Sequence, residues 1–345
     1  MQINSPGLID IHVHFREPGF EYKEDIMSGA LAAAAGGFTT CCCMPNTSPV
    51  ADNPEVIKSI LKKAQKAPIR VLPIGAVTLG QKGKELTDFA ALKKAGAVAL
   101  SDDGLPINDE NIMRSALISA KEHDMLLISH CEEEAAMAAR DIKLAAELDA
   151  RVHIAHISTA ETVDIIRKAK DAGVKVTAET CPHYFSLTSE EVEKQGANAC
   201  MNPPLRTKKD VEAIIEGLCD GTIDVIATDH APHSVEEKSL PVGEGPNGII
   251  GLETALAVTL TFLYHTGKLS MERIIELMSE NPGKILGLEA TADRVIIDTD
   301  EEWLVNPSKF NSKARNTPYA GLKLLGRVKQ TIVQGKVVYK GLNYK

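Results

Sequence analysis

The chain has 345 residues, of which 44% are hydrophobic and 25% are charged, the composition of an ordinary globular protein. Its formal net charge of −9 argues against nucleic acid or an anionic membrane surface as a partner, although one local cationic pocket could still accept a small anion. No apolar run reaches the ~20 residues of a membrane-spanning helix, and the N-terminal MQINSPGLID lacks the basic and apolar regions of a secretory signal.

Seven cysteines occur in the chain, and none forms a C-x-x-C pair. An odd number without a regular spacing is typical of a reducing compartment, so we expect a cytoplasmic protein. Cys41, Cys42 and Cys43 lie in a strand-like segment, where neighbouring side chains point to opposite faces. Three adjacent cysteines therefore cannot share one metal ion, and we interpret them as small hydrophobic core residues.

Short apolar segments alternate with helical patterns along most of the chain. The segments expected to form strands are 8–15, 39–45, 69–77, 97–103, 125–132, 151–158, 174–183 and 223–233. Amphipathic stretches between them include 53–67, 108–124 and 159–173. Gly96 and Gly173 stand where the C-terminus of a helix favours glycine. Eight such units predict parallel strands joined by right-handed crossovers, and hence an α/β protein with a closed (β/α)8 TIM barrel.

An open, doubly wound sheet is the alternative fold, but no G-x-G-x-x-G motif follows the first strand. After the eighth unit the pattern changes to two helical stretches and then to β-strands. The helical stretches are 251–267 and 270–287, and the strands are 294–300 and 331–341, the last with a turn at Gln334 and Gly335. We therefore expect a barrel domain at 7–288, with 1–6 and 289–345 forming a small β appendage.

Two histidines, His12 and His14, stand two residues apart in the first expected strand, within GLIDIHVHFR. In a regular strand both imidazoles project to one side, while Ile11 and Val13 face the other side. Two imidazoles on one face can hold a metal ion, but they can equally be packed histidines of the core. The pair alone leaves both interpretations open.

Further polar residues follow other expected strands at their C-terminal ends, where a barrel enzyme carries its catalytic groups. They are Asp102 and Asp103 after the fourth strand, His130 after the fifth, His156 after the sixth, and Asp229 and His230 after the eighth. Imidazoles and carboxylates together suit Zn2+ or a similar divalent ion, and the set is large enough for one ion or for two bridged ions. Such an ion lowers the pKa of bound water from ~16 to roughly 7, and a neighbouring carboxylate can transfer the proton. The pattern therefore indicates metal-assisted hydrolysis.

Several short motifs combine these residues in a fixed order. DIHVHFREPG, MPNT, SDDG, HCE, HIST, MNPPLR and TDHAPH follow one another from about residue 7. With this combination the chain resembles the class I dihydroorotases of the amidohydrolase superfamily. The resemblance implies a barrel with one or two Zn2+ per chain that interconverts N-carbamoyl-L-aspartate and L-dihydroorotate in pyrimidine biosynthesis.

The resemblance also implies roles for individual residues at the metal centre. His12, His14 and Asp229 would bind the more buried ion, and His130 and His156 would bind the second ion. Many relatives give the bridging position to a carboxylated lysine, but the fourth strand here has no lysine, and the resemblance implies an aspartate instead. The spacing to the histidine of HCE favours Asp103 over the alternative, Asp102, for this position. Asp102 would then be a turn residue or a neighbour of the ligands. His153 is three residues before His156 and is interpreted as structural, and His183 is expected to lie behind the ligands.

The resemblance further implies substrate contacts, namely Arg16, Asn46 and His233 on the carboxylate of dihydroorotate and Asn202 on its ring amide. A guanidinium fork suits a carboxylate, but Arg16 taken singly could also form a surface ion pair with Glu17 or Glu21. Asn46 taken singly could be a helix N-cap. Asp229 would be catalytic, because it would accept a proton during attack on the ring amide and deliver it to the leaving nitrogen.

The chain departs from this family in three places. Family members have a longer segment before the first strand, a longer connection between His130 and His156, and a Gly-containing turn within the stretch that reads LGLEATADRVIID here. The tail strands are therefore expected to lack partners, and unpaired strand edges favour aggregation. These differences predict either a reduced variant or a chain from which segments are missing, and they leave open whether the chain is active alone.

Two other functions also stay open. The first is another cyclic amidase, a hydantoinase or allantoinase, although the missing lysine and the motifs FREPG and DHAPH argue against it. The second is a weakly active scaffold that needs or serves aspartate carbamoyltransferase. We expect a small-molecule substrate and a homo-oligomer, with neither nucleic acid nor a membrane as a partner.

Overall fold

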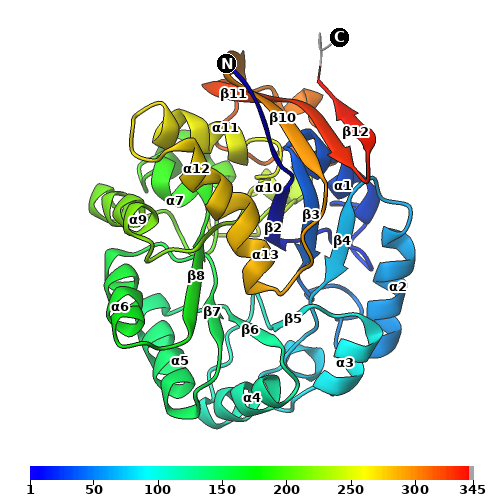
Figure 1. Ribbon diagram of the computed structural model, residues 1–345, viewed down its shortest axis with the longest axis vertical. Helices are drawn as coiled ribbons and strands as arrows, with labels where there is room; N and C mark the ends of the chain where they lie inside the picture. The colour runs from blue at the N-terminus through cyan, green and yellow to red at the C-terminus, as the bar shows by residue number, and fades with distance from the viewer. Residues whose placement is uncertain (342–345) are drawn as a thin grey trace.

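A ring of parallel strands surrounded by helices forms the body of the protein in the computed structural model, which describes residues 1–341 (Figure 1). In chain order the strands are β2 (Leu8–Val13), β3 (Phe38–Cys43), β4 (Arg70–Pro73), β5 (Ala99–Ser101), β6 (Leu126–Ser129), β7 (Val152–Ile154), β8 (Val176–Thr180) and β9 (Val225–Ile226). They pair as β2-β3-β4 and as β5-β6-β7-β8-β9. Parallel bridges from Gly75 to Leu100 and from Val13 to His230 join the two groups and close the ring. The predicted TIM barrel is confirmed.

Helices cover the outside of the ring, and the three amphipathic stretches named from the sequence form α2, α4 and α6. The helices before β9 are α1 (Ile26–Ala35), α2 (Pro54–Ala64), η1 (Leu79–Gln81), α3 (Phe89–Ala95), α4 (Glu110–Glu122), α5 (Glu134–Leu148), α6 (Ala160–Asp171), α7 (Pro182–Ser186), α8 (Glu191–Gln195), η2 (Gly196–Ala199) and α9 (Lys208–Asp220). Capping fixes their ends. The side chain of Asn53 accepts the first free N–H groups of α2, and Gly96 ends α3 with a left-handed φ of 112°.

The helices after β9 are α10 (Val235–Lys238), α11 (Ala255–Thr259), η3 (Leu260–Tyr264), α12 (Met271–Ile275), η4 (Glu276–Glu280) and α13 (Asn281–Ile285). Of these helices, α10 precedes the two stretches expected at 251–267 and 270–287, and the others lie within them. All eight barrel strands are shorter than the sequence suggested, and the physical reason is clear for two of them. β8 stops at Thr180, because Pro182 opens α7 in the first helical turn, where its missing N–H is not needed. β9 has two residues, so the loop with the TDHAPH motif begins directly at the barrel mouth.

The core has an inner and an outer layer. The inner cluster consists of residues from strands and strand ends and includes Cys42, whereas Cys41 and Cys43 belong to the outer cluster beneath the helices. The expected alternation of the three cysteines is confirmed. The same expectation is wrong for β2, where Ile11 lies in the inner cluster and Val13 in the outer one. The pairing of β2 with β3 shifts register between Asp10 and Val13, and such an irregularity re-aims side chains.

An antiparallel sheet forms the appendage beside the barrel. Its strands, in spatial order, are β1 (Gln2–Pro6), β10 (Arg294–Leu304), β11 (Lys323–Val333) and β12 (Lys336–Lys340), and η5 (Pro307–Lys309) lies in the connection from β10 to β11. The predicted turn at Gln334 and Gly335 joins β11 to β12. The expectation that the tail strands lack partners is wrong, because β1 pairs with β10 along its whole length. Val295 and Val328 of this sheet share the outer core cluster with Phe38, so the sheet packs onto the barrel.

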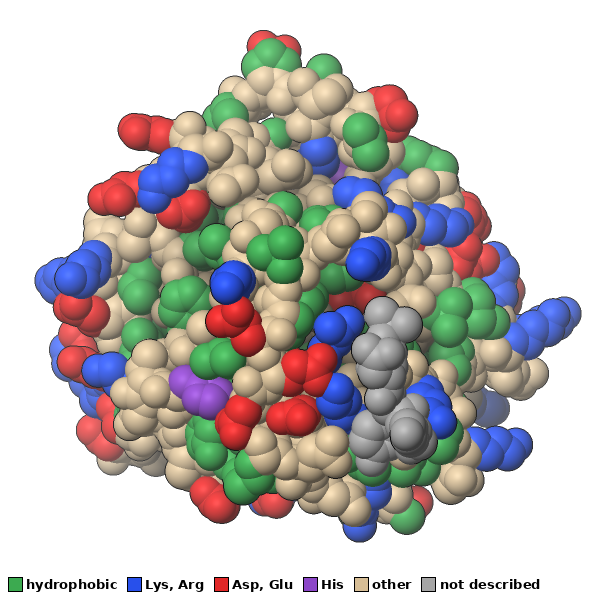
Figure 2. Space-filling model, turned by 90° about the horizontal axis from the view of Figure 1, so that it is seen from above, with side chains coloured by type: hydrophobic (Ala, Val, Ile, Leu, Met, Phe, Trp, Pro, Cys, Tyr) green, Lys and Arg blue, Asp and Glu red, His purple; other side chains and the backbone are tan. Residues whose placement is uncertain are grey.

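The outer surface carries both signs of charge. On the face shown in Figure 2, acidic and basic side chains lie next to one another, and hydrophobic side chains are scattered among them. Within the described residues 1–341, we find no helix with the length and apolar character that a membrane crossing requires.

Candidate metal centre and substrate pocket

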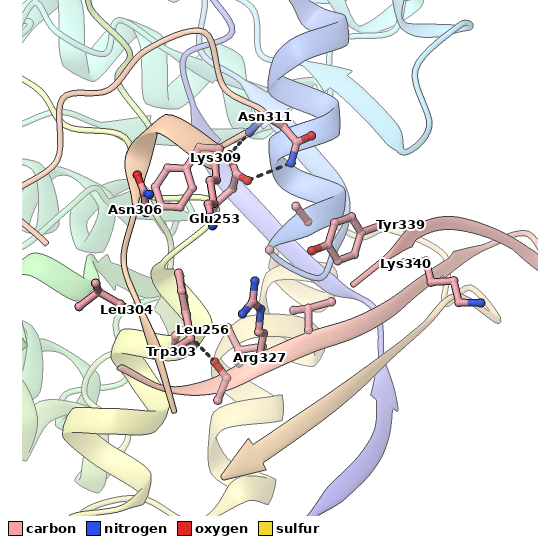
Figure 3. Close-up of a pocket in the computed structure, with 16 residues that line it drawn as sticks. Glu253, Leu256, Trp303, Leu304, Asn306, Lys309, Asn311, Arg327, Tyr339 and Lys340 are labelled. Atoms are coloured by element: carbon pink, nitrogen blue, oxygen red, sulfur yellow. Dashed lines mark hydrogen bonds between the residues drawn. The ribbon is translucent and has the colours of Figure 1, made fainter. Parts of the chain in front are cut away.

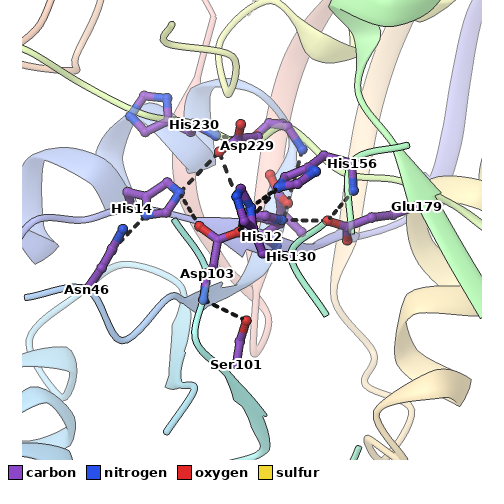
Figure 4. Close-up of polar contacts among 12 residues, drawn as sticks. His12, His14, Asn46, Ser101, Asp103, His130, His156, Glu179, Asp229 and His230 are labelled. Carbon is purple, nitrogen blue, oxygen red and sulfur yellow. Dashed lines mark hydrogen bonds and ion pairs between the residues drawn. The ribbon is translucent and has the colours of Figure 1, made fainter. Parts of the chain in front are cut away.

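The polar residues that follow the barrel strands converge at one mouth of the barrel (Figure 4). They are His12 in β2, His14 directly after β2, and Asp103, His130, His156 and Asp229 after β5, β6, β7 and β9. All six are almost inaccessible to solvent. Their ligand atoms form two groups, each within 4.8 Å, and the first comprises His12, His14 and Asp103 while the second comprises Asp103, His130 and His156. Asp103 belongs to both groups, as a bridging ligand would.

Asp103 lies at the middle of four imidazoles. Its Oδ1 is 3.3 Å from Nε2 of His12, 3.3 Å from Nδ1 of His130 and 3.3 Å from Nε2 of His156. Its Oδ2 is 3.3 Å from Nε2 of His14. Both oxygens of one carboxylate are therefore shared among ring nitrogens that come from three different strands.

Hydrogen bonds fix which nitrogen of His12 and of His14 faces this centre. Nδ1 of His12 donates to Oε1 of Glu179 at 2.5 Å, and Nδ1 of His14 donates to Oδ1 of Asn46 at 2.9 Å. Each ring consequently turns its Nε2 toward Asp103. An oxygen acceptor behind a histidine orients the ring and is the usual arrangement for a histidine that binds a metal ion.

The charges of the centre depend on one another. Burial disfavours ionisation of Asp103, but His12, His130 and His156 hold the pKa of this carboxyl well below its usual range. Burial likewise disfavours a charged His12, but Asp103, Glu179 and Asp229 raise the pKa of its imidazole well above the usual value. Buried carboxylates need a compensating positive charge, and either protons on the imidazoles or a divalent ion can provide it.

Several buried atoms of the centre have no hydrogen-bond partner among the residues that the structure describes. They are Nε2 of His12, Oδ1 of Asp103, Nε2 of His130 and Nδ1 of His156. In addition, Nδ1 of His130 and Nε2 of His156 face each other at 2.8 Å, which requires a proton or another cation beside them. Buried polar atoms are normally satisfied, and imidazole with carboxylate is a donor set that suits Zn2+ and related ions. These residues therefore fit a divalent metal ion.

Three residues of this region have a left-handed backbone. Arg16 has φ 61°, His156 has φ 35° and Asp229 has φ 46°. Such conformations are unfavourable for residues other than glycine and occur where the surrounding structure enforces them, often at functional sites. Their coincidence at one barrel mouth supports the assignment of this mouth as the site.

Two polar neighbours lie outside the centre, as the sequence suggested. Asp102 accepts hydrogen bonds from the backbone N–H groups of Val77 and Thr78 at 2.8 and 3.1 Å and from the hydroxyl of Thr78 at 2.5 Å. It therefore ties down the loop after β4. His153 points away from the clustered ligands, with Nδ1 2.8 Å from Oγ1 of Thr177 and Nε2 3.3 Å from Oε2 of Glu179.

Glu179 is a residue of the site that sequence reasoning missed. It is fully buried in β8, contacts His12 and His153, and accepts a hydrogen bond from the backbone N–H of His156 at 3.4 Å. Burial disfavours its charge, but His12 and His153 hold its pKa far below the usual value. A signal was available, because a carboxylate inside an apolar strand is rarely buried without a partner. His183 is buried beside this region, and burial lowers the pKa of its imidazole to about 4.

The centre opens into a cavity of about 210 Å3. Its lining comes from loops after several strands and consists of His14, Arg16, Asn46, Asp103, Gly104, His130, His156, Asn202, Asp229, Ala231, His233, Asn247 and Gly248. The structure thus brings all four expected substrate contacts to one cavity. Neither alternative considered for single residues is found in the described part of the chain, where Arg16 forms no ion pair with Glu17 or Glu21 and Asn46 caps no helix.

One end of the cavity is cationic. Nε of Arg16 donates to the carbonyl oxygen of Pro232 at 3.1 Å, and its Nη2 lies 3.3 Å from Nε2 of His233. Nε2 of His233 donates to the carbonyl oxygen of Asn247 at 2.8 Å, so its Nδ1 can accept from Nζ of Lys23 at 3.4 Å. Burial lowers the pKa of Arg16 to about 10, which leaves it charged. Burial and the charges of Arg16 and Lys23 lower the pKa of His233 to about 3, so this ring is neutral.

A second cavity, of about 290 Å3, lies between the barrel and the appendage (Figure 3). Its lining includes Glu253, Trp303, Phe310, Arg327 and Tyr339 but no histidine. The guanidinium of Arg327 lies 5.3 Å from the ring centroid of Trp303, which is a cation–π contact. This cavity has no imidazole that could hold a metal ion, whereas the cavity at the barrel mouth has three, so the barrel mouth is the candidate active site.

Solved structures share this fold. The L-hydantoinase (dihydropyrimidinase) of Arthrobacter aurescens has a TM-score of 0.88 and 24% identity, with 98% of this chain and 86% of that chain covered. The dihydropyrimidinase of Brevibacillus agri NCHU1002 has a TM-score of 0.86 and 22% identity, with 99% of this chain and 86% of that chain covered. At this level of identity the likeness concerns the fold alone.

Closer sequence relatives carry one common name. The dihydroorotase of Acetivibrio thermocellus is 47% identical over 370 aligned positions, and the alignment covers 97% of this chain and 87% of that protein. The dihydroorotase of Clostridioides difficile is 48% identical over 369 aligned positions, with the same coverage of 97% of this chain and 87% of that protein. The profile of the family described as dihydro-orotase-like matches residues 2–186. This chain therefore belongs to the dihydroorotase family.

Proposed function

We propose that the protein is a zinc-dependent dihydroorotase that interconverts N-carbamoyl-L-aspartate and L-dihydroorotate in pyrimidine biosynthesis. The observation that carries the proposal is the carboxylate of Asp103 among four imidazoles, next to a cavity whose far end is cationic. Hydrolysis of a cyclic amide with a carboxylate substituent needs ligands for a Lewis acid, a group that transfers protons and a group that binds the carboxylate. The barrel mouth offers all three within one cavity.

The two groups of side chains support the ligands proposed for the metal centre, and Asp229, which is in neither group, is included because its Oδ1 lies near His12 and His14. His12, His14 and Asp229 would hold the more buried ion, His130 and His156 would hold the second, and Asp103 would bridge them. A zinc ion bound here would polarise the amide carbonyl and lower the pKa of water in the site. Glu179 and Asn46 support this arrangement, because they keep Nε2 of His12 and of His14 directed at the centre.

Asp229 is the proposed group for proton transfer. Its Oδ1 lies 3.1 Å from Nε2 of His14 and 3.5 Å from Nε2 of His12, and its side chain lines the cavity. Burial disfavours its charge, but His12 and His14 lower the pKa of its carboxyl below the usual value. As a carboxylate it can accept the proton of the attacking water and return it to the ring nitrogen. In the biosynthetic direction the same residue acts as the acid.

The substrate carboxylate would bind at the cationic end. The guanidinium of Arg16 presents a planar fork to a carboxylate, and it is fixed in place by its bond to the backbone of Pro232. Asn46 already accepts from His14 through Oδ1, so its Nδ2 is the atom that can donate to the substrate. His233 would add a third contact, and Asn202 on the opposite wall would bind the edge of the ring amide.

The test measures hydrolysis of L-dihydroorotate and cyclisation of N-carbamoyl-L-aspartate by the purified chain, together with the zinc content of the same preparation. Hydantoin and allantoin serve as competing substrates, because hydantoinases share the fold. We expect turnover of dihydroorotate and its open-chain product, with one or two zinc ions per chain. Turnover of hydantoin or allantoin in place of dihydroorotate would contradict the proposal.

We also propose an organisation for the whole chain. Residues 7–288 form the catalytic unit, and 1–6 with 289–341 support it from one side, while 342–345 of the expected appendage lie outside the described residues. The seven free cysteines agree with a reducing cytoplasm. α5 begins at Glu134, very soon after His130, so the connection on this side of the site is short. We therefore test whether a partner protein affects the activity. The assay is therefore repeated with added aspartate carbamoyltransferase and at several protein concentrations, which report a heteromeric partner and a homo-oligomer respectively.

A further inference from the structure

Lys238, the last residue of α10, directs its ammonium group at backbone oxygens. Nζ donates to the carbonyl oxygens of Gly248 at 3.0 Å, Pro246 at 3.1 Å and Cys200 at 3.4 Å. Within residues 1–341, Lys238 forms no ion pair with a carboxylate. Three acceptors match the three N–H groups of an ammonium ion, so this side chain is fully engaged by main chain.

The carbonyl groups belong to two segments that form one wall of the candidate active site. Asn247 and Gly248 line the cavity directly, and Cys200 precedes Asn202, which also lines it. The N–H of Gly248 donates to the carbonyl oxygen of Cys200 at 2.9 Å, so the two segments also contact each other. Lys238 donates to both segments at this junction and does not itself line the cavity.

On one side the wall packs closely against the segment that follows β9. A Cβ atom on Gly248 would lie 2.6 Å from Cβ of Ala231 and 3.1 Å from Nε2 of His233. On the same side Nδ2 of Asn316 donates to the carbonyl oxygens of Gly248 at 3.0 Å and Ala231 at 3.1 Å. Residues 239–244, in contrast, are exposed. The loop that leads into the wall therefore depends on the contacts at its ends.

We propose that Lys238 is a positioning residue that holds Asn202, Asn247 and Gly248 at the spacing that the substrate requires. Lys238 does not touch the reacting atoms and acts through three carbonyl groups. The identity of the substrate rests on the proposed function, whereas the tether itself does not. Without the ammonium group the wall moves outward, and the protein binds the substrate and the transition state less tightly to the same extent. Such a change raises KM and leaves kcat unaltered.

The variant Lys238→Met keeps the length of the side chain and removes its charge and its donors. We expect KM for L-dihydroorotate to rise about tenfold, equivalent to ~1.4 kcal/mol, with kcat within about twofold and zinc content unchanged. Lys238→Arg retains charged donors and should restore most of the affinity. Lys208→Met, in an exposed lysine of α9, is the matched control and should alter neither constant.

Hydrogen–deuterium exchange gives a readout that needs no substrate. In Lys238→Met we expect faster exchange in 196–202 and 235–248 and wild-type exchange in the strands of the barrel. If the wild-type protein does not turn over dihydroorotate but Lys238→Met shows this faster exchange, the proposed function is refuted and the tether by Lys238 is supported. Unchanged exchange, a fall in kcat at constant KM, or loss of the whole fold in Lys238→Met would each refute the tether.

Discussion

The two sides of the active-site cavity are built in different ways. The metal centre consists of buried side chains at the ends of parallel strands, and the hydrogen-bonded ring fixes where each of them lies. The opposite wall consists of loop backbone around Asn202, Asn247 and Gly248, held by the side chains of Lys238 and Asn316. The barrel thus positions the chemistry through strand register, while the contacts that recognise substrate depend on individual tethers.

This difference determines how each side should respond to substitution. At the centre, the carboxylate of Asp103 lies next to four imidazoles, so replacing this one residue disturbs all of these ligands together. At the wall, one change removes a few hydrogen bonds and leaves the centre intact. Effects on metal binding and kcat should therefore concentrate at the strand ends, and effects on KM should concentrate at the loops.

Asp103→Asn should break the centre most completely, since it removes the charge shared by both groups of ligands. We expect loss of at least one zinc ion per chain and a rate at least ~1000-fold lower, because the Lewis acid is no longer held in place. Asp102→Asn is a matched control, because it makes the same change one residue earlier, where the side chain contacts Val77 and Thr78. Its zinc content should stay normal. Elemental analysis and steady-state rates measure both, and equal losses in the two variants would contradict the comparison.

Asp229→Asn should separate proton transfer from metal binding. The amide keeps an oxygen near His12 and His14 but cannot accept the proton. We expect kcat to fall by roughly 10^3 while most of the zinc is retained, within the usual range for loss of a general acid–base group. Stopped assays and elemental analysis of one preparation give both values. A near-normal kcat would assign the proton to another group.

The structure brings together the strand-end residues that the sequence singled out, and the reason is physical. Strand ends of a closed parallel barrel meet at one mouth, so polar residues after strands in a linear sequence become neighbours in space. The choice of Asp103 over Asp102 rested on the spacing to the histidine of HCE, and in the structure Asp103 contacts the histidines while Asp102 bonds to Val77 and Thr78. The eight barrel strands followed from local patterning, although each came out shorter than expected, and β9 has only two residues.

The remaining features could not be predicted because they depend on contacts between distant segments. β1 pairs with β10 across almost the whole chain, and no local pattern marks that pairing. The register shift in the pairing of β2 with β3 could not be detected from the sequence, because the prediction of alternating side chains assumes a regular strand. Lys238 carries no motif that distinguishes it from an exposed lysine, since its partners are backbone carbonyls from distant positions in the chain.

Arg16→Lys should affect substrate affinity rather than chemistry and so sharpen the contrast with the centre. Lysine keeps the charge but replaces the planar fork by a point charge and loses the bond from Nε to Pro232. We expect KM for L-dihydroorotate to rise about 30-fold, or ~2 kcal/mol, with little change in kcat or zinc. Arg167→Lys, at an exposed ion pair with Asp220, is the control and should leave KM unchanged. A fall in kcat without a rise in KM would place Arg16 in the chemical step.

Glu253, at the larger cavity beside the appendage, should influence stability alone. Burial raises the pKa of its carboxyl to about 7, against the opposing effect of N–H donors from Ser312 and Asn311. Between the ordinary value of 4.5 and about 7 the folded protein binds a proton that the unfolded chain has released, so this contribution to stability is complete below pH 4.5 and is lost as the pH rises through 7. Glu253→Gln cannot titrate, and its free energy of unfolding should change less between pH 5 and pH 8 than that of the wild type, by a difference on the order of 1 kcal/mol.

Urea unfolding at several pH values measures this difference, and kcat and KM should stay at wild-type values. A steeper pH dependence in the variant would show that the carboxylate, rather than the neutral acid, stabilises the junction between barrel and appendage.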